Sequence, residues 1–228
     1  MAMSTAASID TAQRPLLARR SRRGRAGRRP TLITIRQAAR EDCARIARLY
    51  MIASDGVAEY MWSKADEPGS SLLEIGERRY AREGTALSYQ NCLVAENDGG
   101  VIGMMLSYAM HGWEGDGATS TVDPVLEPFT ELVDHASLYI AALAMFHEHR
   151  GLGIGTRLLA EAQRRARTMG LERLSLICFE KNVRALCLYK RIGFQELRRR
   201  PIVPHPFLNY REGDAILLAC RTGELNID

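Results

Sequence analysis

The chain has 228 residues, of which 46% are apolar and 25% are charged, and it carries a formal net charge of +4. This length suits one domain, and the apolar fraction is typical of a globular protein and too high for a disordered one. No run of 18 or more apolar residues occurs, so we expect no membrane-spanning helix and no membrane partner.

The cysteine usage argues against two kinds of stabilised protein. The five cysteines are scattered and form no C-x-x-C pair, so the sequence predicts neither a disulfide framework nor a metal site. This usage favours a reducing, cytoplasmic setting. Cys92, Cys178 and Cys220 lie in apolar runs, and we expect them to be small core residues.

The positive charge is concentrated at the N-terminus. Residues 1–31 carry eight arginines and one acid, Asp10, whereas the other 197 residues carry 23 basic and 26 acidic side chains. Such a segment buries too little apolar surface to offset its conformational entropy, so a disordered tail is predicted. Three alternatives remain for it: an extension from a start codon placed too early, a phosphate-binding arm that contacts nucleic acid, and an organelle transit peptide.

The first elements of the folded part are a strand and two helices. A strand is expected over residues 32–36, and an apolar face predicts a helix over 41–53. A second helix should run from Ser71 to about residue 82. Glu74 lies three residues after Ser71, as a capping box requires.

A hairpin and a long connection come next. Strands are predicted over residues 92–95 and 101–106, on either side of the turn sequence Asn-Asp-Gly-Gly at 97–100. The polar stretch from about residue 109 to 136 contains Gly and Pro. It is longer than loops usually are when they carry no function.

The second half of the chain predicts alternating strands and helices. Gly170 lies where a helix C-cap glycine belongs. This order indicates a mixed α/β fold with one domain over residues 32–222, followed by a short tail at 223–228. The elements, in order, are a strand over 138–145, a helix over 156–169, a strand over 174–179, a helix over 182–190 and a hairpin of 194–199 with 215–220.

A glycine-rich turn separates the strand over 138–145 from the following helix. In Arg150-Gly-Leu-Gly-Ile-Gly155, alternating glycines allow backbone N–H groups to point inward, and the helix adds its own free N–H groups. Such a turn forms an anion site for a pyrophosphate. Taken alone, it is equally a tight turn before a helix. A G-x-G-x-x-G dinucleotide motif fails in both registers, and no Gly-Lys pair exists for a P-loop. The motif that the turn does match is R-x-x-G-x-G, from Arg150 through Gly153 to Gly155.

A second pattern begins at Asn182, a good helix N-cap residue. Tyr189 follows seven residues later on the same helical face, about 10 Å along the axis. Taken alone, Tyr189 is equally a core aromatic residue whose hydroxyl group reaches water.

Together these motifs resemble the GNAT superfamily of N-acetyltransferases, closely over residues 138–194. The resemblance implies a GNAT-like fold, acetyl-CoA as the donor and no metal. It implies that Asn182 and the main chain of Leu143 and Met145 contact the pantetheine arm, that the Met145 N–H polarises the thioester, and that Tyr189 protonates the leaving thiolate. The cofactor-binding residues so implied are Leu143, Ala144, Met145, Arg150, Gly151, Leu152, Gly153, Ile154, Gly155, Thr156 and Asn182.

The general base is the least determined part of the expected site. Many relatives carry a Glu on the strand before the turn, but residues 138–145 contain none. Our candidate is Glu131 in the long connection. Glu127, Asp134 and His135 in the same connection are alternatives, and Tyr139 could relay the proton through a water. It is also open whether a bound water, or no residue at all, takes the proton.

Charge gives a hint about the acceptor. Between Glu83 and His149 there is no Lys or Arg, and ten acids occur. A negative field attracts cations, so we expect the acceptor to be the primary amine of a small cationic molecule or a basic peptide end. The resemblance implies that the acetyl group passes to it directly. The alternatives are a solvated acidic surface, a non-catalytic acetyl-CoA sensor, and a nucleic-acid-associated protein that acts through its basic tail. The oligomeric state is open, and a homodimer is compatible with the sequence.

Overall fold

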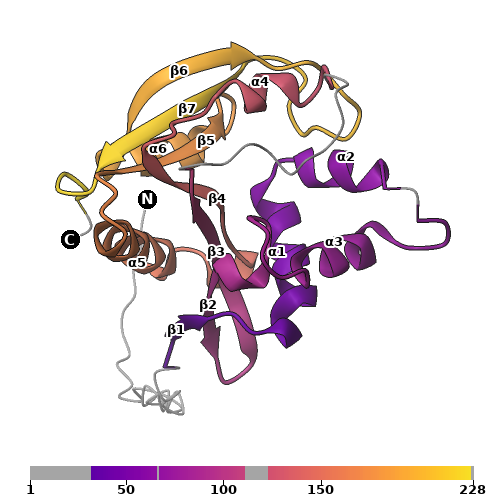
Figure 1. The fold of residues 1–228 in the computed structure, drawn as a ribbon, viewed down its shortest axis with the longest axis horizontal. Helices are drawn as coiled ribbons and strands as arrows, with labels where there is room; N and C mark the ends of the chain where they lie inside the picture. Colours follow the sequence, from indigo (N-terminus) through magenta and orange to yellow (C-terminus); the bar gives the residue numbers. More distant parts are fainter. Residues whose placement is uncertain (1–31, 66, 111–122, 227–228) are drawn as a thin grey trace, which may run out of the picture. The chain divides into compact units, whose positions relative to one another are not determined.

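Within the residues that the computed structural model describes, 32–65, 67–110 and 123–226, seven strands form one mixed sheet (Figure 1). Their order is β1-β2-β3-β4-β5-β7-β6, and only the neighbours β4 and β5 are parallel. The strands are β1 Thr34–Gln37, β2 Cys92–Asn97, β3 Gly100–Ala109, β4 Ser137–Met145, β5 Arg173–Phe179, β6 Gln195–Pro201 and β7 Asp214–Arg221. The predicted tail at 1–31 lies outside the described residues, as does the part of the long connection at 111–122.

The helices cover both faces of the sheet. In Figure 1, α5 lies on one side of β2, β3 and β4, and α1 lies on the other side. The α-helices of the described residues are α1 Cys43–Ala53, α2 Val57–Ser63, α3 Leu72–Tyr80, α4 Glu127–Thr130, α5 Ile154–Thr168 and α6 Val183–Arg191. Short 3₁₀ turns precede α1, β2 and α5, at Arg40–Asp42, Tyr89–Asn91 and His147–His149.

Side chains of β3 that point to opposite faces of the sheet pack into two different hydrophobic cores. Met105 packs in the cluster that includes the apolar face of α5, whereas Met104 and Leu106 pack in the cluster that includes α1. Successive side chains of a strand point to opposite faces, so a continuous apolar strand is required here. Burial of both faces fixes the register of β3, because a slip by one residue would exchange the two sets.

The predicted α/β fold class is confirmed, and most elements lie within two residues of their expected bounds. The capping box is present: Ser71 accepts a hydrogen bond from the Glu74 N–H, and the Glu74 carboxylate accepts one from the Ser71 N–H. Gly170 ends α5 with a φ of +70°. The cysteines expected in the core, Cys92, Cys178 and Cys220, are buried.

Three features differ from the expectation. Helix α2 was not predicted, because its seven residues are too few to show a helical period. Helix α4 lies inside the segment expected to be a connection. The predicted C-terminal tail begins as part of the fold, since Leu225 is buried in the α5 core and the Asn226 N–H donates to the Ile192 carbonyl oxygen.

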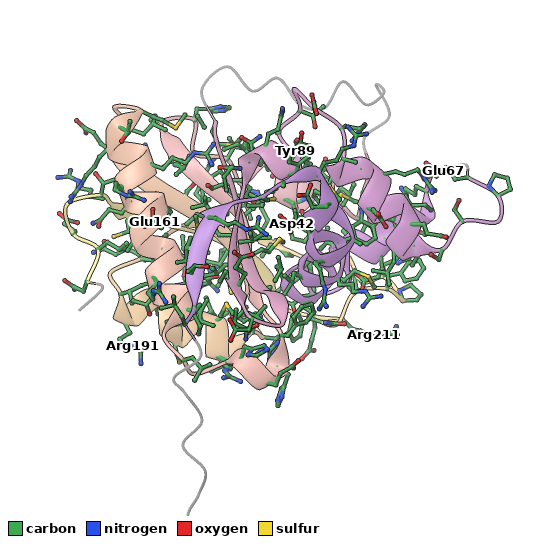
Figure 2. The ribbon with its side chains drawn as sticks, turned by 90° about the horizontal axis from the view of Figure 1, so that it is seen from below. Asp42, Glu67, Tyr89, Glu161, Arg191 and Arg211 are labelled. Carbon is green, nitrogen blue, oxygen red and sulfur yellow. The ribbon has the colours of Figure 1, made fainter. Side chains whose placement is uncertain are left out.

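The surface of the described residues carries ion pairs whose side chains are buried to different degrees. Asp42, at the start of α1, accepts hydrogen bonds from the guanidinium of Arg36 on β1, and Figure 2 shows it beside that strand. Glu67 lies on the loop between α2 and α3 that projects from the body of the unit, where it pairs with Arg78 (Figure 2). No helix among the described residues is long and apolar enough to cross a membrane.

Candidate active site

A cleft opens in the sheet where β4 and β5 diverge. The two strands pair only at their beginnings, from Ser137 opposite Arg173 to Tyr139 opposite Ser175. Beyond Tyr139, β4 is paired with β3 alone among the described strands, so its backbone is open on the β5 side. The cleft has a volume of about 1970 Å³. Ordinary ligand pockets hold roughly 300–1,000 Å³, so two substrates have room here.

A bulge bends β4 at the point where the cleft begins. In the register with β3, Ser107 lies opposite Ile140 and Leu106 lies opposite Ala142, so Ala141 is an extra residue. Ile140 packs on the α5 side and Ala142 on the α1 side, although a regular strand would place both on one face. The bulge therefore reverses which face of the sheet the side chains of the following β4 residues point to.

The segment predicted to hold the pantetheine arm lines this cleft. Leu143, Ala144 and Met145 all follow the bulge and contribute to the cleft wall. The side chains of Leu143 and Met145 pack toward α5 and that of Ala144 toward α1, so the strand edge between them is free for an extended chain. An extended ligand can add to such an edge as a further strand does.

Two glycines shape the turn that follows. Gly151 and Gly153 have φ angles of +79° and +73°, in the left-handed region that costs other residues about 1–2 kcal/mol. Gly153 is the N-cap of α5, so the first N–H groups of the helix face the same side of the turn. An anion is stabilised there by these donors and by the helix dipole. Gly151, Gly153 and Thr156 line the cleft.

Gly155 and Arg150 join the turn to β4, one by close packing and the other by a hydrogen bond. A Cβ on Gly155 would lie 3.2 Å from the Met145 Cε, so this glycine allows α5 to pack closely on β4. Arg150 lines the cleft, and its Nε donates to the Met145 carbonyl oxygen at 3.4 Å. Leu152 is exposed and Ile154 is buried in the α5 core.

Asn182 uses both ends of its side-chain amide. Its Oδ1 accepts a hydrogen bond from the Ala185 N–H at 3.2 Å, which caps α6 as predicted. Its Nδ2 donates to the Asp55 carboxylate at 2.9 Å. A contact with the pantetheine arm, which the sequence led us to expect, would have to share a group already used inside the protein.

Tyr189 lies in the wall of the cleft, on α6. Its ring packs against Phe194 with a centroid distance of 5.6 Å. Burial raises the pKa of Tyr189 well above its ordinary value, and Cys178 and Asp55 raise it further. The phenol therefore carries its proton at neutral pH.

Three of the expected base candidates do not reach the cleft. Glu131 is exposed outside the cleft wall, where its carboxylate pairs with Arg200 on β6. Asp134 is buried and pairs with Arg173 at the start of β5. His135 is exposed and also lies outside the cleft wall. The structure therefore offers no support for our choice of Glu131, because a surface ion pair already occupies its carboxylate.

Two other expected residues line the cleft. Glu127 is exposed at the start of α4 and faces the cleft. Tyr139 on β4 packs edge-on against Tyr108, with ring centroids 5.6 Å apart. Burial raises the pKa of Tyr139, so it too remains a neutral phenol.

Two carboxylates of the cleft wall were not among the base candidates. Asp123 pairs with Lys64, which leaves Asp55. It follows α1 in the left-handed region with a φ of 50°, and Gly56 after it has a φ of +97°. The Asp-Gly pair was a signal for a turn. Nothing local indicated that this turn meets Asn182, because the two residues are 127 positions apart.

Tertiary contacts offset much of the acidic stretch between Glu83 and His149. In the described residues, five of its acids pair with Lys or Arg from outside the stretch: Glu83 with Arg40, Glu96 with Arg36, Asp123 with Lys64, Glu131 with Arg200 and Asp134 with Arg173. The negative field expected from the sequence is therefore weaker in the fold. No cluster of three or more His, Cys, Asp or Glu that could hold a metal occurs in the described part of the chain.

The comparison with protein families agrees with this geometry. The sequence model of the family described as "Acetyltransferase (GNAT) family" matches residues 57–194, more than half of the chain. The chain belongs to this GNAT family. Family membership confirms the predicted N-acetyltransferase with acetyl-CoA as its co-substrate, and the open β4 edge and the glycine turn fit that molecule.

Three similar proteins illustrate the likeness to known acetyltransferases. Thialysine N-epsilon-acetyltransferase of Bos taurus is 27% identical over 175 residues, which cover 72% of this chain and 85% of the relative. A solved N-acetyltransferase from Staphylococcus aureus Mu50 is 25% identical with a TM-score of 0.58, and the match covers 82% of this chain and 99% of the solved one. The structure of yncA from Salmonella typhimurium with its cofactor acetyl-CoA has a TM-score of 0.52 at 20% identity, covers 84% and 95% of the two chains, and supports the fold alone.

Proposed function

We propose that this GNAT enzyme transfers the acetyl group of acetyl-CoA directly to the primary amine of a small cationic acceptor. The observation that carries the proposal is the meeting of three features in one cleft. These are the glycine turn before α5, the phenol of Tyr189 and the carboxylate of Asp55. They supply an anion site, a proton donor and a site for a cation.

We assign the contacts with acetyl-CoA to residues of the cleft wall. The turn at Gly151 and Gly153 and the N-terminus of α5 hold the pyrophosphate, and the open edge of β4 holds the pantetheine arm. The Met145 N–H polarises the thioester carbonyl. Tyr189 donates its proton to the sulfur when the carbon–sulfur bond breaks.

The acceptor end favours a cation for two reasons. Asp55 is a carboxylate whose described partners are two neutral amides, so its negative charge is not cancelled by an ion pair there. The rings of Tyr50, Tyr108 and Tyr139 line the same cleft, and aromatic faces attract cations. The relative named for thialysine acts, by that name, on the ε-amine of a lysine-like molecule, which is consistent with this acceptor class.

A thiol-release assay tests the proposal. The purified chain is mixed with acetyl-CoA and single amines: thialysine, 1,4-diaminobutane, a basic peptide, and glutamate as an anionic amine. We expect CoA release that depends on the cationic amines and is much slower with glutamate. Equal release with glutamate contradicts the cationic acceptor, and acetyl-CoA binding without any release favours the non-catalytic sensor.

A further inference from the structure

We propose that Asp55 binds the ammonium group of the acceptor and takes a proton from it before acetyl transfer. This inference rests on the proposed function, because it assigns a residue to the acceptor of that reaction. It fills the role of general base, for which β4 offers no carboxylate.

The backbone around Asp55 is held in place from both sides. Asp55 lies between Ala53, the last residue of α1, and Val57, the first residue of α2, and its φ of 50° is unusual for a residue other than glycine. A Cβ on Gly56 would overlap the carbonyl oxygen of Phe207, so the turn packs directly on the loop between β6 and β7. The Asn209 N–H also donates to the Asp55 carbonyl oxygen at 2.9 Å. A strained, over-determined turn of this kind is typical of functional sites.

The carboxylate is oriented by two neutral donors. Asn182 Nδ2 donates to Oδ2 at 2.9 Å, and Asn209 Nδ2 donates to Oδ1 at 3.4 Å. No Lys or Arg of the described residues forms an ion pair with Asp55, in contrast to Asp123 and Asp134. Each carboxylate oxygen has a second lone pair, so an ammonium group can still bind.

Four titratable groups from different elements lie close enough to Asp55 for its charge to affect them. Tyr189 lies on α6, Cys178 on β5, Tyr210 on the loop between β6 and β7, and Glu59 on α2. The tyrosines and the cysteine are neutral at pH 7, and Glu59 adds a like charge. Burial raises the pKa of Asp55, and the two amide hydrogen bonds only partly oppose this shift. Asp55 is thus a stronger base than a carboxylate in water.

The proton balance of the reaction closes with these residues. Asp55 takes one proton from the R–NH₃⁺ group and becomes a neutral acid. The R–NH₂ nitrogen then attacks the acetyl carbonyl carbon, a C–N bond forms and the C–S bond breaks. Tyr189 gives its proton to the sulfur and regains one from the amide nitrogen, and Asp55 releases its proton to water. The sum is R–NH₃⁺ and acetyl-CoA giving the amide, CoA–SH and one H⁺.

The test is the variant Asp55→Asn. Asn tolerates the left-handed backbone and retains an oxygen that accepts from Asn182, so the fold should be kept. The control is Glu212→Gln, which removes a carboxylate from a surface pair with Lys181 on the neighbouring loop. Thermal melts and acetyl-CoA calorimetry should show both variants to be folded and equally able to bind acetyl-CoA. At pH 7 we expect kcat/KM for 1,4-diaminobutane to fall about 100-fold in Asp55→Asn and to stay unchanged in Glu212→Gln.

The pH profile separates a base from a merely structural residue. The native enzyme should reach a plateau in kcat/KM above the pKa of Asp55. In Asp55→Asn, kcat/KM should rise about tenfold per pH unit toward the pKa of the free amine, about 10, so the gap between the two closes at high pH. Parallel profiles, or equal kcat/KM at pH 7, overturn the inference while the proposed function stands. No release from the native enzyme with any cationic amine instead overturns the proposed function.

Discussion

Asn182 donates a hydrogen bond of 2.9 Å to the carboxylate of Asp55, although the two residues are 127 positions apart in the chain. The same side chain caps α6, the helix that carries Tyr189. One amide therefore contacts both the carboxylate proposed to bind the acceptor and the start of the helix that carries the proposed proton donor. This link couples the two halves of the proposed reaction.

Replacement of Asn182 by Ser separates the capping of α6 from the hydrogen bond to Asp55. Ser is as good an N-cap as Asn, so α6 should remain stable, but the shorter side chain does not reach Asp55. We expect a melting temperature close to the native one and about a tenfold loss of kcat/KM for a cationic amine. Asn182→Ala loses the cap as well, so it should also unfold about 1 kcal/mol more easily. Full activity in Asn182→Ser would contradict the coupling.

Tyr189→Phe removes only the proton that the proposed mechanism delivers to the leaving sulfur. The ring contact with Phe194 is kept, so folding and acetyl-CoA affinity should not change. Loss of a general acid lowers the rate by about 100-fold or more, and single-turnover CoA release measures it. The matched control is Tyr89→Phe, whose hydroxyl group donates to Glu83 outside the cleft (Figure 2). Equal losses in both variants would argue against the role of Tyr189.

The local structure of the proposed donor half follows from the sequence more directly than that of the proposed acceptor half. The turn at Gly151 and Gly153 and the cap at Asn182 depend on residues close in sequence, so their pattern carries the geometry. The acceptor half depends on contacts between distant segments. Asp55 reaches the cleft because Gly56 packs on Phe207, and no local pattern reports that contact.

The position of Glu131 outside the cleft wall has the same physical origin. The sequence alone predicts an uncompensated negative field over the acidic stretch, because the basic partners of these acids are far away in the chain. The pairing of Asp134 with Arg173 depends on the parallel pairing of β4 with β5, and that of Glu131 with Arg200 depends on the place of β6 in the sheet. The hairpin of β6 and β7 was predicted, but the insertion of β7 between β5 and β6 was not.

Gly153→Ala tests the glycine turn as an anion site. The φ of +73° makes alanine strained by about 1–2 kcal/mol, although space for its methyl group is available. We expect the backbone N–H groups to move out of line, with about a tenfold weaker affinity for acetyl-CoA by calorimetry and little change in affinity for the amine. The control is Gly223→Ala, a glycine with open space around it and no positive φ. A native affinity in Gly153→Ala would show that the turn does not hold the pyrophosphate.

The ion pair of Asp42 with Arg36 should contribute to stability in a pH-dependent way. The side chain of Asp42 is only 8% exposed and accepts from the Arg36 guanidinium and from the Ala39 N–H at 2.8 Å. Burial acts to raise the pKa of Asp42, but the hydrogen bonds from Arg36 and Ala39 outweigh it, so the pKa lies below its ordinary value of 3.8. A carboxyl group with a lowered pKa stabilises the fold fully above that ordinary value. The stabilisation is lost as the pH falls through the lowered pKa.

Asp42→Asn should therefore reduce the free energy of unfolding by about 2 kcal/mol at pH 7, measured by urea denaturation. The difference from the native chain should shrink as the pH falls below about 4, because the native Asp42 then becomes protonated too. Glu67→Gln is the matched control, since Glu67 is 41% exposed and pairs with the exposed Arg78 (Figure 2). Pairs of that kind contribute about 0–1 kcal/mol, so its effect should be small at every pH. A difference for Asp42→Asn that stays constant from pH 7 to pH 3 would show that the packing of its side chain, and not its charge, stabilises this end of α1.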